Sequence, residues 1–290
     1  MQGTMILNGI ITGIIMGGIL SLPVLGIAVV YGITGVPNFA IGLIGVIGGY
    51  TTWYFTADLG LPLAILIGMA VCFPIGFFLQ SILLTPLSKK GADATLFFII
   101  TVALGFVFQG LIKVVFPKLS VSIALPRLGA IAIADVSADG VKFVALGVTV
   151  GTLILIRLLE QHTKVGKELQ ATSQNLRLAN LIGINTGMVF GFAHGIGCSL
   201  AAVGAIFWGS LYSLDLTTGW SLGFTGYIIA VIGGIGNIWG GLISALIMGL
   251  VMSFAGYLLG GVWQNAILYI VVMLVLIIRP RGILGSERAI

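Results

Sequence analysis

The chain has 290 residues, of which 59% are hydrophobic and only 7% are charged, and its net charge is +5. Soluble domains need about 25% charged residues to keep their surface in water, so this composition excludes a soluble protein. The basic residues lie at the ends of apolar runs and form no patch for nucleic acid. The 44 glycines suit membrane helices that pack closely or break.

The N-terminal region is one long uncharged run. A hydrocarbon core about 30 Å thick is crossed by about 20 helical residues. The first 57 residues contain no Asp, Glu, Lys or Arg, which is too long a run for a single crossing. We therefore expect two spans with a break at Tyr31–Asn38, where Gly32, Gly35 and Pro37 disfavour a continuous helix.

Further apolar runs continue almost to the C-terminus. Four of them are expected to be spans at Leu61–Leu84, Ala94–Phe116, Val141–Leu159 and Thr186–Tyr212. The uncharged run after Asp215 accommodates three short spans, separated by breaks at Gly233–Gly241 and Leu259–Gly261. The sequence predicts an all-α polytopic membrane protein with about nine transmembrane helices, or eight as the alternative, in a single transmembrane domain over 1–290.

The basic residues are divided unequally between the two sides that this topology defines. One side carries Lys89, Lys90, Arg157, Lys164, Lys167, Arg177, Arg279, Arg281 and Arg288. The other carries only Lys113, Lys118, Arg127 and Lys142. The positive-inside rule makes the richer side cytoplasmic, so we expect the N-terminus outside and the C-terminus inside a bacterial inner membrane.

The sequence offers no internal source of energy and no catalytic site. No Asp, Glu, Lys or Arg falls in the middle of a predicted span, and His194 is more typical of a packed core histidine than of a proton relay. The GxxxxGK[ST] motif is missing, so the chain is not expected to hydrolyse ATP itself. Cys72 and Cys198 lack ligand spacing, so we expect no metal, no disulfide and no bound cofactor.

The longest polar stretch, residues 160–185, has an amphipathic pattern. Its apolar positions recur every three or four residues and predict a short helix with one apolar stripe: Val165, Leu169, Thr172, Leu176, Ala179 and Ile182. Gly183 is expected to end that helix. The helix could rest on the membrane surface, or it could dock a soluble cytoplasmic subunit through Glu168, Gln170, Ser173, Gln174 and Arg177. The lack of an internal energy source favours docking.

Four segments together resemble one family. They read GKELQATSQNLRLANLIGIN at 166–185, VYGITGVPNFA at 30–40, VIGGIGN at 231–237 and RPRGILG at 279–285. The chain resembles, over nearly its full length, the branched-chain amino-acid ABC importer permeases of the LivH-type subunit. The resemblance implies a type II-like importer with a homologous second permease, two cytoplasmic ATPase subunits that bind ATP and Mg, and a periplasmic solute-binding protein.

The resemblance also implies roles for particular residues. Residues 160–185 would be a cytoplasmic coupling segment that sits in a groove of the ATPase, with contacts from Gly166, Glu168, Leu169, Ala171, Thr172, Ser173, Gln174, Asn175, Arg177 and Gly183. Our candidates for lining the translocation pathway, at and after the first helix break, are Tyr31, Asn38, Phe39 and Thr51. The cargo would be a branched-chain amino acid, with urea, short amides and small carboxylates as alternatives.

One departure from the family and one rival function remain at this stage. Relatives commonly have His-Gly-Glu after Asn-Phe-Ala, whereas this chain has Ile41-Gly42-Leu43. The rival function is a stand-alone secondary carrier or facilitator, which would work without ATP and whose cytoplasmic segment would bind nothing.

Overall fold

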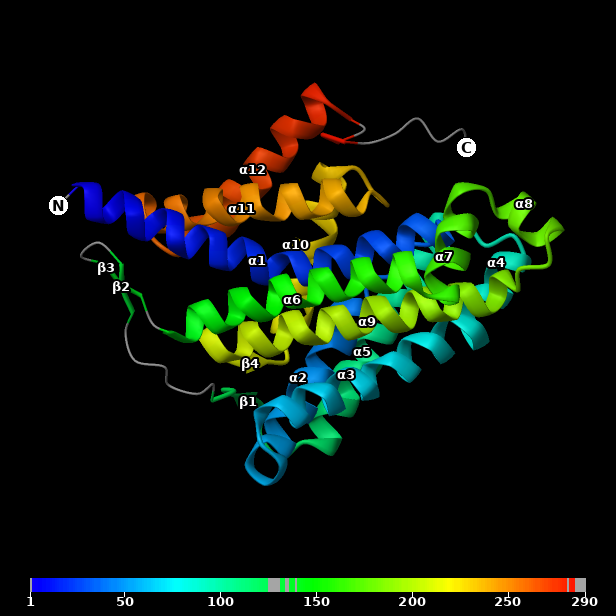
Figure 1. Ribbon diagram of the computed structural model, residues 1–290, viewed down its shortest axis with the longest axis horizontal. Coiled ribbons are helices and arrows are strands. Elements are labelled where there is room, and N and C mark those ends of the chain that lie inside the picture. The colour runs from blue at the N-terminus through cyan, green and yellow to red at the C-terminus, as the bar shows by residue number, and fades with distance from the viewer. Residues whose placement is uncertain (1, 125–130, 134–135, 139, 281, 285–290) are drawn as a thin grey trace.

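A central helix, α1 (Gln2–Thr34), organises the fold (Figure 1). The computed structural model describes residues 2–124, 131–133, 136–138, 140–280 and 282–284. Other helices surround α1 on several sides, so its middle is buried although it carries no polar face. Glycines permit this packing: Gly26 lies directly against the backbone of Gly197, and Gly17 against that of Gly249. Close backbone approach of this kind is a common means of packing membrane helices.

The remaining elements follow in chain order. The helices after α1 are α2 (Ile41–Leu59), α3 (Leu61–Phe78), the π-helix η1 (Leu79–Leu84), α4 (Thr85–Lys89), α5 (Ala94–Val115), α6 (Gly140–His162), α7 (Lys164–Gln174), α8 (Leu176–Leu181), α9 (Thr186–Leu211), α10 (Thr218–Gly233), α11 (Ile238–Leu259) and α12 (Trp263–Ile278). The strands are β1 (Ser120–Val121), β2 (Ile131–Ile133), β3 (Val136–Ala138) and β4 (Leu214–Asp215).

Each span expected from the sequence coincides with a helix. The break predicted in the N-terminal run is confirmed, because α1 ends at Thr34 and α2 begins at Ile41. Within the described residues, five helical stretches are long and apolar enough to cross a membrane: Ile6–Thr34, Leu61–Lys89, Ala94–Val115, Thr186–Leu211 and Ile238–Leu259. Helices α10 and α12 are apolar but shorter.

The third span extends beyond its expected end at Leu84. The chain passes from α3 through the π-turns of η1 into α4 and stops at Lys89. Pro86, which has no backbone N–H to donate, lies just after the π-turns of η1. The helical path nevertheless continues to Lys89, past the end that the sequence indicated.

Two small antiparallel ladders add strand structure that the sequence did not predict. In the first, Ser120 pairs with Asp215 and Val121 with Leu214. The second is the hairpin of β2 and β3. Both lie toward the end of the bundle that holds the N-terminus (Figure 1). They order part of the long connection between α5 and α6, which the sequence indicated only as a loop.

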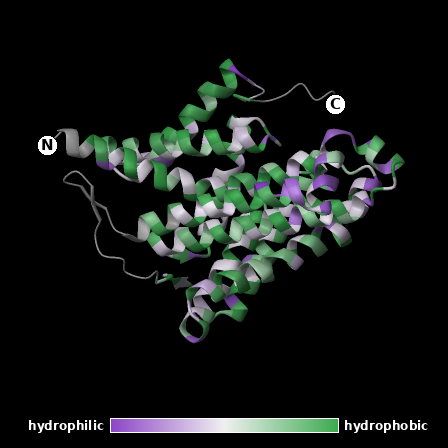
Figure 2. Cartoon of the chain, in the orientation of Figure 1, coloured by the Kyte–Doolittle hydropathy of each residue, from purple (hydrophilic) through white to green (hydrophobic). Residues whose placement is uncertain are grey.

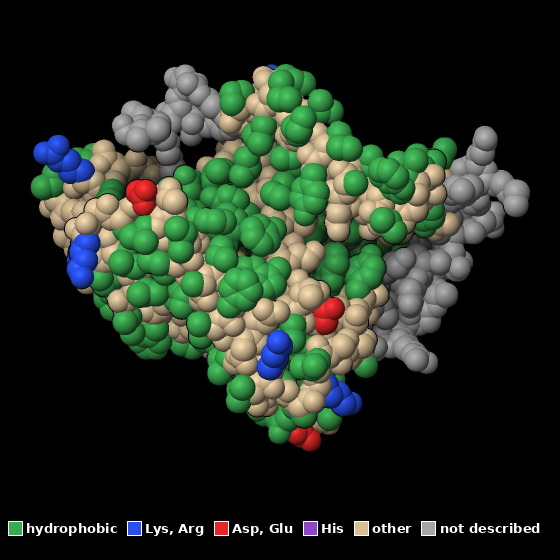
Figure 3. Space-filling view, turned by 180° about the vertical axis from the view of Figure 1, so that it is seen from behind, with side chains coloured by type: hydrophobic (Ala, Val, Ile, Leu, Met, Phe, Trp, Pro, Cys, Tyr) green, Lys and Arg blue, Asp and Glu red, His purple; other side chains and the backbone are tan. Residues whose placement is uncertain are grey.

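The distribution of charged and hydrophobic residues changes along the direction in which the helices run. The sides of the helices are largely hydrophobic, and the hydrophilic residues of α7 gather at one end (Figure 2). On the rear face, charged side chains lie toward the ends with apolar ones between them (Figure 3). Helices α4, α7 and α8 share the end opposite the N-terminus (Figure 1). Arg127, Arg281 and Arg288, used above to predict orientation, lie outside the described residues.

Candidate functional site

Three side-chain caps shape the polar segment between α6 and α9. Thr163 accepts a hydrogen bond from the N–H of Gly166 at 3.0 Å and starts α7. Asn175 accepts from the N–H of Leu178 at 3.0 Å and starts α8, and Asn185 does the same for α9 through Met188. Because each cap satisfies a free N–H at a helix start, the segment folds as two short helices.

The single amphipathic helix predicted for this segment is therefore wrong. Asn175 has an extended backbone that separates α7 from α8 and turns the apolar residues of α8 outward. Leu176, Ala179 and Ile182, expected on one apolar stripe, do not share one environment: Leu176 and Ile182 are exposed, whereas Ala179 is buried. The predicted end at Gly183 is confirmed: its φ of 84° is the left-handed conformation that ends a helix, and the N–H of Ile184 reaches the carbonyl of Ala179.

The inner face of α7 holds the segment against the bundle. Leu169 is buried in a cluster with Val29 of α1 and Val189 and Ala193 of α9. Thr172 is also buried, and Gly166 lies against the backbone of Leu159 and Glu160, where a side chain would not fit. Gly166, Leu169 and Thr172 were predicted to contact a partner, but they lie in the interior of this chain, so any part they have in docking is indirect.

The outer face carries the other predicted contact residues. Gln174, Asn175, Arg177 and Gly183 are exposed, and Glu168, Ala171 and Ser173 are partly exposed. Next to them, α8 presents apolar side chains that the prediction did not include: Leu176, Leu178, Leu181 and Ile182. Leu181 and Ile182 are each 74% exposed. We call these four residues and Arg177 the α8 surface. A contiguous apolar patch beside polar groups is typical of a binding surface.

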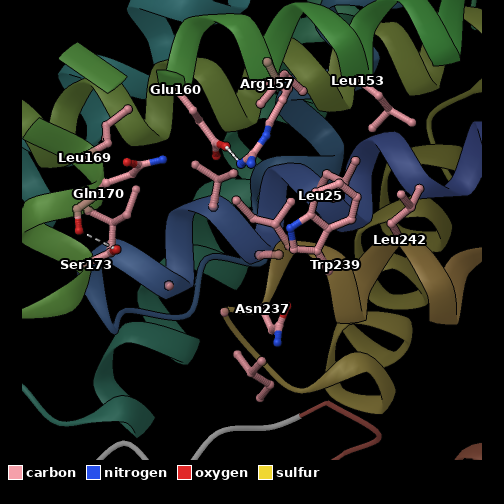
Figure 4. Close-up of a pocket in the computed structure, with 18 residues that line it drawn as sticks. Leu25, Leu153, Arg157, Glu160, Leu169, Gln170, Ser173, Asn237, Trp239 and Leu242 are labelled. Carbon is pink, nitrogen blue, oxygen red and sulfur yellow. Dashed lines mark hydrogen bonds and ion pairs between the residues drawn. The ribbon is translucent and has the colours of Figure 1, made fainter. Parts of the chain in front are cut away.

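A cavity of about 340 Å³ lies behind α7 (Figure 4). Its walls come from α1, α6, α7, α11 and the turn that joins α10 to α11. Arg157 and Glu160 form an ion pair at its edge, with 3.6 Å between Nη1 and Oε2. The Arg157 guanidinium also lies 5.8 Å from the ring of Trp239. Sequence reasoning missed this site, because Arg157 and Trp239 belong to helices far apart in the chain.

The pathway candidates meet in part at the break between α1 and α2. Asn38 is only 3% exposed; its Oδ1 accepts from the N–H of Ala40 at 2.9 Å, and its Nδ2 has no partner among the described residues. Phe39 packs against Phe98, Phe224 and Tyr227, with centroids 4.4 to 5.4 Å apart.

The other two candidates are separated from that cluster to different degrees. Tyr31 lies on the last turn of α1, beside Gly236. Thr51 lies several turns along α2, buried, and its hydroxyl donates to the Ile47 carbonyl at 2.8 Å. The structure thus brings Asn38 and Phe39 together at the break and places Thr51 apart from them.

Comparison with known proteins identifies the class of this molecule. The sequence pattern of the family described as "Branched-chain amino acid transport system / permease component" matches residues 9–278. The chain belongs to this family. It is therefore a multi-pass membrane permease and the transport component of an ABC system, which sets aside both an enzyme and the stand-alone carrier.

Curated relatives extend over nearly the whole permease. The high-affinity branched-chain amino acid transport system permease protein BraD of Pseudomonas aeruginosa is 28% identical, over 96% of this chain and 95% of its own length. The LivH protein of Escherichia coli is 25% identical with the same coverage. A probable branched-chain amino acid transport permease protein LivH of Methanocaldococcus jannaschii is 29% identical, over 98% of this chain.

A solved structure supports the fold of the permease. PsaBC from Streptococcus pneumoniae, in complex with Fab, superposes with a TM-score of 0.51 over 96% of this chain and 92% of the other. The sequence identity is 16%, so this likeness concerns the fold alone.

The departure noted after Asn38-Phe39-Ala40 falls in the interior of the permease. Ile41 is 1% exposed and Leu43 is 0% exposed, and Gly42 lies against α10 at Gly219 and Gly223. Ile41 and Leu43, which depart from the expected family motif, are thus core side chains. Polar side chains here would need partners that the apolar surroundings do not supply.

Proposed function

We propose that this chain is the translocation subunit of an ATP-driven importer for branched-chain amino acids. The observation that carries the proposal is the α8 surface: Leu181 and Ile182 are largely exposed on a segment whose inner face is fastened to the bundle. The named function of the curated relatives supports this class of cargo.

The proposed partners are the other subunits of an ABC importer. A cytoplasmic ATPase docks on the α8 surface and the exposed face of α7, within the coupling segment 160–185. Two such subunits bind ATP and Mg, a homologous second permease completes the membrane part, and a periplasmic solute-binding protein delivers the cargo. The α7 end then faces the cytoplasm and the N-terminus faces outside, as the excess of basic residues near α7 favours.

The contacts of α7 offer a route from ATP to the pathway. When the ATPase closes, it displaces α7, and Leu169 passes the movement to Val29 of α1 and Val189 of α9. Helix α1 ends at Thr34, between one and two turns after Val29, at the break that holds Asn38 and Phe39. A break is a natural hinge because its residues can absorb changes in φ and ψ. Tilting there would switch the pathway between the two sides of the membrane.

The break also has chemistry suited to a branched-chain amino acid. The rings of Phe39, Phe98 and Tyr227 form an apolar wall for an aliphatic side chain. The free Nδ2 of Asn38 and the N-terminus of α2 offer donors to a carboxylate.

Docking is tested by co-purification of the ATPase subunits with tagged permease. Leu181→Asp should lower their recovery at least about tenfold, because a charge would be buried in an apolar contact. Val262→Asp is the matched control: Val262 is 92% exposed and lies in the turn between α11 and α12, outside the coupling segment. The proposal fails if wild-type permease recovers no ATPase, or if both variants behave alike. The small molecule held by the co-purifying solute-binding protein identifies the cargo.

A further inference from the structure

The cavity behind α7 has an apolar end and a polar end. Three of its walls show the same order: Leu25 of α1, Leu153 of α6 and Leu242 of α11 lie deeper in the bundle. Nearer the α7 end, the lining changes to Arg157, Glu160, Gln170, Ser173 and Asn237 (Figure 4). A ligand that fills this space must be amphiphilic, with its polar group toward the α7 end.

Arg157 is held in place at the polar end. The Glu160 carboxylate pairs with Nη1 of Arg157. When the Gln161 amide is oriented so that its own hydrogen bonds are satisfied, its oxygen accepts hydrogen bonds from Arg157 Nε at 3.1 Å and Nη2 at 3.0 Å. A guanidinium has five N–H donors, and the Arg157 side chain is 48% exposed. It therefore keeps donors for an external anion. The ring of Trp239 lies beside it, as tryptophan does at the level of lipid headgroups.

The outer surface on both sides of the cavity is lipid-facing in character. Helix α6 exposes Ile154 and Leu155, and α11 exposes Ile243 and Ile247. The two helices that supply Leu153 and Leu242 to the cavity thus also present surface that suits hydrocarbon. The stretch 157–168 has three basic and two acidic residues, hence a net charge of +1, and juxtamembrane basic charge attracts anionic lipid.

We propose that this cavity binds an anionic phospholipid from the leaflet at the α7 end. Its phosphate contacts Arg157 and Gln170, its glycerol region lies along Trp239, and one acyl chain enters between Leu25, Leu153 and Leu242. This site goes beyond the proposed function; only its assignment to the cytoplasmic leaflet rests on the proposed orientation. Since Leu169, Gln170 and Ser173 line the cavity, the lipid would touch the helix that we assign to coupling.

Native mass spectrometry of the full-length protein tests the site. Purified protein is offered phosphatidylglycerol and phosphatidylcholine with identical acyl chains. The wild type should retain phosphatidylglycerol in preference, and Arg157→Gln should lower that preference about fivefold. Lys89→Gln, which removes an equal charge at the same end but outside the cavity, should leave it unchanged. Leu153→Trp, which keeps every charge and fills the apolar end, should reduce retention of both lipids.

A second measurement locates the lipid without disturbing the charges. Phosphatidylglycerol with brominated acyl chains should quench part of the tryptophan fluorescence, and Trp239→Phe should remove that part. Equal preference in wild type and Arg157→Gln would overturn the proposal. So would displacement of the lipid by millimolar glycerol phosphate or leucine, because the cavity would then be a site for a soluble anion or for the cargo. Both measurements use the permease alone, so they stand whether or not the ATPase binds.

Discussion

Tyr50 of α2 donates a hydrogen bond to the carbonyl oxygen of Leu119, with 2.6 Å between Oη and O. The same hydroxyl lies 3.4 Å from the carbonyl oxygen of Leu214 in β4. One buried phenol thus joins α2 to the chain that follows α5 and to the chain that follows α9. The β1–β4 ladder and a bond from the N–H of Ile123 to the carbonyl of Gly209 close the same end of the bundle.

Replacing Tyr50 by Phe should loosen that end. The change leaves the ring in place but removes the donor from the partly buried carbonyl of Leu119, so we expect a loss of about 1 kcal/mol of stability. Thermal unfolding in detergent, followed by tryptophan fluorescence, measures it. Tyr54→Phe is the control, because the same chemical change falls on a side chain that is 54% exposed. Equal unfolding temperatures for the two variants would show that the hydrogen bond adds nothing to stability.

The contact of Gly26 with Gly197 gives a steric prediction. A methyl group on Gly26 would collide with the Gly197 backbone, and overpacking a close contact costs about 1–3 kcal/mol. Gly26→Ala should therefore lower the unfolding temperature and the yield of monodisperse protein in size-exclusion chromatography. Gly151→Ala on α6 has open space around the added methyl and should behave as wild type. If both behave as wild type, the α1–α9 approach is looser than described.

The sequence predicts the spans well because their ends carry local signals. Charges and glycines mark most ends, and Gly35 and Pro37 mark the break between α1 and α2. The division of the coupling segment was not predicted, since the spacing of apolar residues continues unbroken past Asn175. The side-chain oxygen of Asn175 accepts a hydrogen bond from the N–H of Leu178. This contact competes with helix continuation and separates α7 from α8.

The cavity was beyond the reach of sequence reasoning for a different reason. In the sequence, Arg157 and Glu160 lie near the end of a predicted span, a position from which their side chains can extend into water. The site that they form also includes Trp239, which approaches from α11, a helix far from α6 in the chain. The break residues lie between these cases: their position was predictable, but the partners of Phe39 on α5 and α10 were not, because they depend on how distant helices meet.

The attachment of α7 to the bundle and the docking of the ATPase should be affected by different substitutions. Leu169→Ala removes a buried side chain that links α7 to α1 and α9, at a cost of about 2 kcal/mol, but it leaves the α8 surface unchanged. ATPase recovery should stay near wild type, while cargo transported per ATP hydrolysed falls in proteoliposomes. Leu66→Ala, the same chemical change at a side chain of α3 that is 60% exposed, is the control for transport. A parallel loss of ATPase binding in Leu169→Ala would mean that one contact serves both roles.

Asp215 gives the fold a dependence on pH at the end that carries β4. Burial raises its pKa, but hydrogen bonds from the hydroxyls and N–H groups of Thr218 and Thr217 outweigh that effect, so the pKa is lowered. A lowered pKa adds stability above the unfolded value, about 3.9, and this stability is lost as the pH falls through the folded value. Asp215→Ala should therefore destabilise the protein near neutral pH by about 1.5 kcal/mol, the usual worth of a hydrogen bond to a charged group. The difference from wild type should shrink below about pH 4 in thermal unfolding scans.

Asp58→Ala, a change at an exposed carboxylate at the end of α2, should show no such convergence. A constant difference for Asp215→Ala at every pH would contradict the assignment.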